Sequence, residues 1–455
     1  MTLLKRERDI ITHNEYADRF DFDEIREFIT NAPKELFISH TFKHSNKTLV
    51  QPRGGFPTYN KMFALYHEFQ KANIDVMPLT VDSHTRLNDY ASAKKMLMLS
   101  EENEVDMLNG YPLVTHGYRT TRKMITHFNT PVSLRHGTPD ARLLIETALA
   151  SGIFEIEGGP ITYLLPYSKN FPLDKAFLYW KYVEKICAEY STLNEPINRE
   201  SFGPLTATLV PPCITIVIQL LEMLLSLEEG VKSFSVSFAQ HGSVMQDIVS
   251  ANVLRKTANY YAQKIGCSDA TINIVYHQWM GAFPRNKELS DSLINTSTVI
   301  AALVRADKII VKTRDEAFGI PTMQCNAQSV ANTKYTLQVL NGLPNISDAA
   351  EEENLEAEIH SIMEAVLNDS ADTLWRKAFN SIKNGIIDVP FSPHIINHNA
   401  VITIRDAQSN IRIIEKGKLP ISEKCFAFER SHVSLSDDKT AVINKIICDI
   451  GVMHE

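Results

Sequence analysis

Residues 131–144 read PVSLRHGTPDARLL, and their order predicts one unit of a parallel α/β fold. Val132 and Leu134 give a short apolar strand that ends in Arg135, and an amphipathic helix follows. An arginine at the end of a buried strand needs a partner, because an unpaired buried charge is costly. Either a carboxylate of the protein neutralises Arg135, or the position serves an anion from outside.

The same order of strand and helix recurs from about residue 35 to residue 330. Stretches that read as helices, such as 173–190 and 245–265, separate most of the apolar segments. Alternating strands and helices are typical of parallel β/α units, and eight units close a TIM barrel of roughly 250 residues. The candidate strands exceed eight by one, so one is misassigned or lies outside the barrel: 35–42, 75–83, 112–117, 132–137, 154–158, 206–210, 234–240, 271–278 and 308–313. A doubly wound open sheet is the alternative, but no G-x-G-x-x-G supports a nucleotide-binding version.

Polar residues gather where the candidate strands end. Asp-Ser-His at 82–84, Arg-His-Gly at 135–137 and Glu-Gly-Gly at 157–159 each follow an apolar run. A TIM barrel carries its chemistry at the carboxyl ends of its strands. We therefore predict an α/β fold whose TIM (β/α)8 barrel spans residues 35–330 and is the catalytic domain.

Two flanking regions do not follow this alternation. Residues 1–34 are charged and are predicted to form a helical extension. Farther on, 346–369 reads as an acidic helix and 401–422 as a hairpin. We expect 331–455 to be an appended α+β region that covers a barrel face or contacts a partner.

Composition limits the class of protein. The net charge of −8 among 455 residues argues against a dedicated nucleic-acid binder. The most apolar stretch, 213–227, contains Gln219 and Glu222 and is too short to span a bilayer, and the N-terminus does not read as a signal peptide. Six cysteines lie far apart without a C-x-x-C motif, which favours free thiols in a reducing compartment. We expect a cytoplasmic protein with neither a membrane nor a nucleic acid as its partner.

Several common catalytic motifs do not occur in the sequence. There is no P-loop, H-E-x-x-H, G-x-S-x-G or zinc-type Cys/His cluster. Four histidines stand near strand ends without the spacing of metal ligands: His84, His116, His136 and His241. A hydrogen-bonded histidine is the favoured interpretation of each, so no metal site is predicted.

Three arginines follow strand-like runs and would approach the same end of a barrel: Arg53, Arg86 and Arg135. Taken singly, each would pair with a nearby carboxylate such as Asp82, Asp89 or Asp140. Together they favour a receptor for a di-anion, because guanidinium groups bind carboxylates through two parallel hydrogen bonds.

An acidic residue and two phenols follow the next strand. Glu157 ends that strand, two glycines let the backbone turn, and Tyr163 and Tyr167 come next. A carboxylate is the partner that an ammonium group needs. Three cations, one carboxylate and two phenols together complement an acidic amino acid.

Five ordered motifs give the sequence a family resemblance: LVQPRGG (49–55), PLTVDSHTR (78–86), SLRHGTPDARLL (133–144), EGGPITYLLPYSKN (157–170) and KIIVKTRDEAFGIPT (308–322). They resemble the catalytic (epsilon) subunit of glutamate mutase, also called methylaspartate mutase. The resemblance implies a TIM-barrel isomerase that interconverts L-glutamate and threo-3-methylaspartate. It also implies a radical mechanism with adenosylcobalamin, in which the cofactor performs the hard chemistry.

The resemblance assigns roles to residues of both ligands. It implies that Arg53, Arg86 and Arg135 hold the substrate carboxylates, so that Arg135 pairs with the substrate and not with a protein acid. Glu157 would be the catalytic residue that accepts from the substrate amine, with Tyr163 and Tyr167 in contact with the substrate. Residues around the adenosyl group would be Gly55, Thr80, Asn109, Pro166, Met280, Lys312 and Glu316.

The resemblance also implies a partner. The cobalt-binding motif D-x-H-x-x-G does not occur here, since residues 82–87, DSHTRL, lack its glycine. The cobalt ligand is therefore expected from a small cobalamin-binding sigma subunit, in a hetero-oligomer that contains a homodimer of this chain. Two alternatives stay open: a related cobalamin-dependent mutase for another acidic amino acid, and a non-catalytic barrel subunit.

Overall fold

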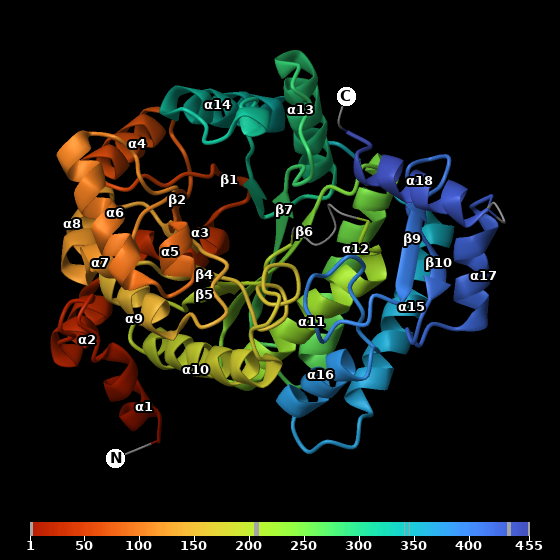
Figure 1. Cartoon of the computed structure of the whole chain (residues 1–455), viewed down its shortest axis with the longest axis horizontal. Coiled ribbons are helices and arrows are strands. Elements are labelled where there is room, and N and C mark those ends of the chain that lie inside the picture. Colours follow the sequence, from red (N-terminus) through yellow and green to blue (C-terminus); the bar gives the residue numbers. More distant parts are fainter. Residues whose placement is uncertain (1–2, 204–208, 341, 345, 435–437, 454–455) are drawn as a thin grey trace.

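Eight parallel strands form one sheet at the centre of the molecule. The computed structural model describes the whole chain except residues 1–2, 204–208, 341, 345, 435–437 and 454–455. The strands are hydrogen-bonded in the order β1-β8-β7-β6-β5-β4-β3-β2, and helices surround them (Figure 1). Their bounds are β1 Leu49–Gln51, β2 Met77–Thr80, β3 Val132–Arg135, β4 Glu155–Glu157, β5 Asn198–Glu200, β6 Ser233–Ala239, β7 Thr271–His277 and β8 Lys308–Ile310.

The first and last strands of this order, β1 and β2, meet without a regular ladder. The Val50 N–H donates to the Asp75 carboxylate at 2.9 Å, and the Asp75 N–H donates to the Val50 carbonyl at 3.3 Å. Farther along, the Thr80 N–H donates to the Gly54 carbonyl at 3.0 Å. These bonds bring the two sheet edges together into a nearly closed barrel. The predicted TIM-type barrel is confirmed, and the open-sheet alternative is wrong.

The outer layer consists of helices that follow the strands along the chain. Polar side chains cap several of them, including Thr58 before α4, Ser243 before α12 and Asn286 before α13. The longer helices are α4 Tyr59–Lys71, α6 Tyr90–Asn103, α8 Tyr118–Phe128, α9 Arg142–Ser151, α10 Leu173–Ser191, α11 Pro212–Glu228, α12 Val244–Lys264, α13 Lys287–Leu303 and α14 Met323–Val339. The helices expected at 173–190 and 245–265 are confirmed as α10 and α12, and α14 continues past residue 330.

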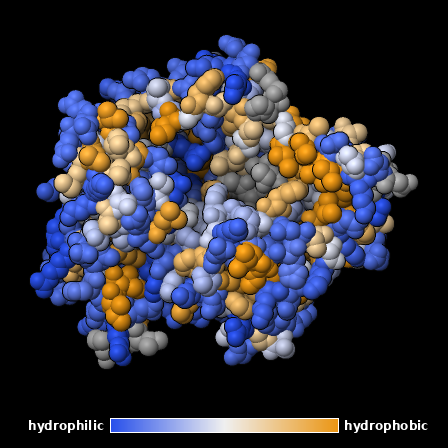
Figure 2. All heavy atoms as spheres, in the orientation of Figure 1, coloured by the Kyte–Doolittle hydropathy of each residue, from blue (hydrophilic) through white to orange (hydrophobic). Residues whose placement is uncertain are grey.

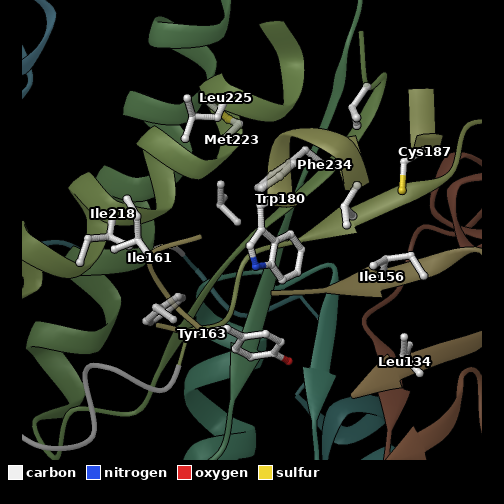
Figure 3. Packing of buried hydrophobic residues seen from close by; sticks show 14 of the residues in the cluster. Leu134, Ile156, Ile161, Tyr163, Trp180, Cys187, Ile218, Met223, Leu225 and Phe234 are labelled. Atoms are coloured by element: carbon white, nitrogen blue, oxygen red, sulfur yellow. The ribbon is translucent and has the colours of Figure 1, made fainter. Parts of the chain in front are cut away.

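Helix α11 explains the most apolar stretch of the sequence. Its side chains are buried from Pro212 to Leu227, because the barrel strand β6 covers one side and helix α15 (Ala349–Leu367) covers another. Figure 3 shows Ile218 of this helix in the same buried cluster as Ile161 and Phe234. Within the part of the chain that the structure describes, no helix is long and apolar enough to cross a membrane.

The two ends of the chain add helices and a hairpin. Helices α1 (Leu3–Thr12) and α2 (Phe22–Asn31) precede the barrel, as the sequence predicted. After α15 come α16 Leu374–Lys383, the antiparallel pair β9 Val401–Arg405 and β10 Ile411–Lys416, α17 Glu423–Ser431 and α18 Lys439–Ile450. The expected acidic helix and hairpin are both confirmed, and this α+β part lies beside α11 and α12 (Figure 1).

Two of the candidate strands were wrong. The segment 35–42 falls in the turn η1 (Lys34–Leu36) and helix α3 (Ile38–His44). Its apolar residues are buried because they close the amino-terminal end of the barrel: Phe37 stacks on Phe154 with ring centroids 4.0 Å apart. The segment 112–117 forms helix α7 (Leu113–His116), since β2 and β3 pair directly and leave no place for a strand between them. Of 206–210, residues 206–208 lie outside the described residues.

Strand β5 was missed because all three of its residues are polar. Asn198 donates to Glu155 at 3.1 Å and Arg199 donates twice to Glu184, at 2.9 and 2.8 Å. Glu200 accepts from a lysine inside the barrel, and all three residues are at most 1% exposed. Buried polar groups persist where partners satisfy them, which is the case for each residue of this strand. Strand β1 was missed as well, because its apolar run is short.

Candidate functional site

The carboxyl ends of the barrel strands collect the charged residues that the sequence singled out. Arg53 follows β1, Arg86 follows β2, Arg135 ends β3, Glu157 ends β4 and Lys312 follows β8. Because all these strands are parallel, their carboxyl ends open on one face of the barrel. Figure 2 shows a hollow near the centre of the molecule, with hydrophilic residues along it.

Arg135 is held by two acids of the protein. Its Nη1 contacts Glu157 and lies 2.8 Å from Oε1 of Glu200. Two carboxylates of the protein thus contact Arg135 in the buried barrel interior, and the substrate contact that the resemblance implies for it stays a prediction. Its Nε and Nη2 are buried and have no hydrogen-bond partner among the described residues. Two donors of this guanidinium group are thus available for a further anion.

Of the three arginines at the strand ends, Arg86 has the least compensation of its charge among the described residues. Its Nε donates to the Val81 carbonyl at 3.1 Å, and no described carboxylate forms an ion pair with it. Burial lowers the pKa of Arg86, with a smaller contribution from the positive charge of Arg53. The phenols of Tyr163 and Tyr167 lie close enough to act on its charge. An anion placed between these groups would supply the missing negative charge.

Glu157 has its position fixed by a phenol and an imidazole. The Tyr163 hydroxyl donates to the Glu157 carboxylate. His136 accepts from the Thr138 N–H through Nδ1 at 3.1 Å, so its Nε2 carries the proton and donates to the Glu157 carbonyl at 2.8 Å. Burial, together with the charges of the surrounding arginines, holds the pKa of His136 well below its usual range. His136 is therefore a neutral hydrogen-bonding residue, as predicted.

A third group of charges lies at the end of β8. Lys312 is 5% exposed and donates to the Glu316 carboxylate at 2.6 Å. The nearest guanidinium nitrogen of Arg53 is 4.0 Å from the same Glu316 oxygen. Burial, followed by the charge of Arg53, lowers the pKa of Lys312 to about 8. The structure thus brings Arg53, Lys312 and Glu316 together, and Glu316 bridges the two cations.

The sequence as a whole matches a known family. The model of the methylaspartate mutase E chain matches residues 33–449. The chain belongs to the methylaspartate mutase E chain family. The glutamate mutase epsilon subunit of Desulfitobacterium hafniense (strain Y51) is 37% identical over 421 residues, which cover 91% of this chain and 87% of that protein. Those of Haloarcula marismortui and Escherichia coli O157:H7 are 34% and 36% identical, and the matches cover 89% and 85% of this chain and 82% and 81% of those proteins.

The remaining residues suggested by resemblance to E chains lie at or after the carboxyl ends of β1, β2, β4 and β7. A Cβ atom at Gly55 would collide with the Thr80 carbonyl, so the two loops approach as closely as they do only because residue 55 is glycine. The Thr80 hydroxyl is buried and has no partner among the described residues. Asn109 is exposed and accepts from the Ser83 N–H at 2.9 Å. Pro166 and Met280 are half-buried.

Sequence reasoning missed a buried ionic cluster beneath the site. Lys308 donates to Glu155 at 2.6 Å and to Glu200 at 2.7 Å, and Glu200 also binds Arg135. His277 lies 3.7 Å from Glu200, and burial lowers its pKa to about 4. The signal in the sequence was the run of polar residues at 198–200.

Glu157, Glu200 and His277 have ligand atoms within 4.8 Å of one another, a spacing that could hold a metal ion. However, the guanidinium group of Arg135 contacts both of these carboxylates. A second cation would therefore be repelled by the arginine. The structure assigns these groups to ionic contacts within the E-chain barrel. The other strand-end histidines also have protein partners: His84 with Asp89, His116 with the Pro57 carbonyl and His241 with Asp247.

Proposed function

We propose that this chain is the catalytic subunit of an adenosylcobalamin-dependent glutamate mutase. It interconverts L-glutamate and threo-3-methylaspartate by a radical rearrangement of the carbon skeleton. The observation that carries the proposal is the surplus of unused guanidinium donors beside Glu157: Arg86 has no ion pair, and two nitrogens of Arg135 are unbonded among the described residues. Family membership and the names of the relatives support the same isomerase class.

The proposed substrate complex follows from the charges. One substrate carboxylate binds Arg135 through its two unbonded nitrogens, and the other lies between Arg53 and Arg86. The ammonium group takes the Glu157 carboxylate, which Arg135 then releases in part. Each ionic hydrogen bond lost within the protein is replaced by a hydrogen bond to a substrate group of the same charge. The exchange of protein contacts for substrate contacts therefore changes the free energy little. A ligand with a single carboxylate would leave the half-buried Arg86 without an anionic partner, which disfavours monocarboxylates.

The residues around the opening fit a nucleoside group. Glu316 offers carboxylate oxygens and Lys312 an ammonium group, which suit ribose hydroxyls and adenine nitrogens. The Thr80 hydroxyl, which has no partner among the described residues, and the exposed Asn109 add two more polar groups near the glycine loop. When bound, adenosylcobalamin supplies the carbon radical that the rearrangement needs. The chain's own residues hold the substrate, keep Glu157 in place and exclude water.

The proposal includes a partner and an assembly. A small cobalamin-binding sigma subunit provides the cobalt ligand, since residues 82–87 lack the glycine of D-x-H-x-x-G. We propose a hetero-oligomer that contains a homodimer of this chain. The six free cysteines support a cytoplasmic location, because reduced thiols are usual there.

Reconstitution tests the proposal. The purified chain is mixed with a small cobalamin-binding subunit and adenosylcobalamin, and methylaspartate formed from L-glutamate is measured. Turnover is expected only in the complete mixture, and the isolated chain should bind adenosylcobalamin weakly. Tight binding of adenosylcobalamin by the isolated chain would contradict the role of the partner. Turnover of another acidic amino acid, but not of glutamate, would favour the related-mutase alternative, and no turnover of either would favour the non-catalytic one.

A further inference from the structure

Helix α11 carries one buried carboxylate that the proposed reaction does not use directly. Glu222 is 2% exposed, in a helix most of whose side chains are apolar. Its Oε1 accepts from the backbone N–H groups of Ile161 and Thr162 at 2.9 and 2.8 Å. The Thr162 hydroxyl donates to Oε2 of the same carboxylate at 2.9 Å. The carboxylate therefore accepts three hydrogen bonds from one short segment.

That segment begins a helical turn directly after Glu157. The Tyr163 N–H donates to the Gly159 carbonyl at 3.2 Å, and the Leu165 N–H donates to the Ile161 carbonyl at 3.0 Å. The first N–H groups of such a turn have no partner within it. Residue 160 is proline and has no N–H, so the N–H groups left over are those of Ile161 and Thr162. Glu222 serves as the cap of this turn from a different helix.

Two glycines are required for this arrangement. A Cβ atom at Gly159 would collide with the Glu222 carboxylate, and one at Gly158 would collide with the Tyr163 ring. Gly158 also has a φ of 102°, which disfavours any other residue. The two glycines of the Glu-Gly-Gly motif therefore let the Glu222 carboxylate approach the backbone at residue 159 and let the Tyr163 ring pack against residue 158. Figure 3 shows the phenol oxygen of Tyr163 pointing away from the apolar cluster around Ile161 and Trp180.

We infer that Glu222 is a positioning residue, which holds the turn at 159–163 so that the Tyr163 hydroxyl stays on Glu157. The inference rests on the proposed function for its kinetic consequences, but the geometry of the turn can be tested without it. Among the described residues, the cation that acts on Glu222 most is Arg199 of β5, and Glu184 of α10 already holds that guanidinium group through two hydrogen bonds. The carboxylate is therefore committed to the turn.

Hydrogen exchange tests the positioning directly. In Glu222→Leu, amides 161 and 162 lose their acceptor, so exchange of the peptide that contains them should rise about tenfold or more. Glu222→Gln keeps one acceptor oxygen and should show a smaller rise. Glu146→Leu is the control, because Glu146 is also a buried carboxylate on an outer helix but binds Arg8 and Tyr182. It should lower the melting temperature without changing exchange at 161 and 162.

Kinetics of the reconstituted enzyme give the second readout. Glu222→Leu should lower kcat/KM about ten- to hundredfold, and Glu222→Gln should recover part of the loss, whereas Glu146→Leu should leave kcat/KM unchanged. Burial raises the pKa of Glu222 to about 7, so the wild type should lose activity as pH falls below 7. Glu222→Gln should lack this limb of the pH profile.

The outcomes separate the two proposals. Unchanged exchange at 161 and 162 in Glu222→Leu overturns the positioning role, whatever the activity. Faster exchange with wild-type kcat/KM overturns its importance for the site. Faster exchange in a chain that lacks mutase activity altogether leaves Glu222 as the cap of the turn and refutes the proposed function alone. If Glu222→Leu does not fold, the same comparison is made between Glu222→Gln and the wild type, where equal exchange and equal pH profiles refute the inference.

Discussion

Replacing Arg86 by lysine separates a substrate contact from a structural one. The guanidinium group makes one hydrogen bond to the protein, from Nε to the Val81 carbonyl, and no ion pair among the described residues. Lysine keeps the positive charge but cannot form two parallel hydrogen bonds to a carboxylate. Arg86→Lys should therefore weaken substrate binding while changing stability little.

The magnitude follows from the number of bonds. Losing one charge-assisted hydrogen bond to the substrate costs about 1.5–3 kcal/mol, which is roughly ten- to 150-fold in kcat/KM. Loss of the bond to the Val81 carbonyl costs the folded state about 1 kcal/mol. The kinetic effect should thus exceed the effect on stability in free-energy terms. If Arg86 had only a structural role, the loss of stability should exceed the loss of kcat/KM in free-energy terms.

Two assays measure these effects. The first is kcat/KM with L-glutamate in the reconstituted enzyme, and the second is the protection against heat that L-glutamate gives to the isolated chain. Arg119→Lys is the matched control, since Arg119 is exposed and donates from Nη1 to the Arg19 carbonyl. If Arg86→Lys keeps wild-type kcat/KM and is protected by glutamate as well as the wild type, Arg86 does not bind the substrate.

Three further predictions concern the charged groups around the site. Glu157→Gln should lower kcat more than it weakens glutamate binding, because the ionised carboxylate is needed once the amine is in place, and equal losses in both would contradict this role. In the folded chain the pKa of Lys312 is lowered to about 8, so between pH 8 and pH 10.5 the Lys312 side chain holds its proton more often in the unfolded chain than in the folded one. The contribution of Lys312 to the free energy of unfolding should therefore rise with pH over that range. Urea unfolding at both pH values checks this, with Lys312→Met expected to lack that rise. Lys308→Met should cost about 3–5 kcal/mol of stability, since it leaves the buried Glu155 without its cation and Glu200 with Arg135 alone, and adding Glu155→Gln should restore part of it.

The sequence predicts the barrel well where its strands are apolar. Strands β2, β3, β4, β6, β7 and β8 each match an expected segment, with β6 beginning one residue earlier, because hydrophobic runs bounded by polar tips are read directly from the chain. It fails at β5, where partners on other strands replace apolarity, and at 35–42, where an apolar segment closes one end of the barrel as a helix. Both failures arise from long-range contacts, which local pattern does not encode.

The residues of the candidate site also fall into two groups, those that the sequence predicts and those that it does not. The residues at strand ends, such as Arg86 and Glu157, could be found from the sequence because parallel strands bring their carboxyl ends together. Glu200 and Lys308 could not, since their roles depend on which side chains meet inside the barrel. A protein carboxylate is one of the two partners that the sequence leaves open for Arg135, but the sequence does not identify Glu157 and Glu200 as those acids. Charge pairing in a barrel interior depends on register between strands, and register is set by the closed sheet.

The seam between β1 and β2 has a mechanical consequence for the arginines above it. Arg53 leaves β1 and Arg86 follows β2, so the width of this seam sets the span between two guanidinium groups. The Asp75 carboxylate accepts from Val50 on one side and from Lys334 of α14, at 2.9 Å, on the other. One side chain therefore ties two strands and an outer helix together at the amino-terminal side of the seam, and so fixes the spacing of the strand ends that Arg53 and Arg86 follow.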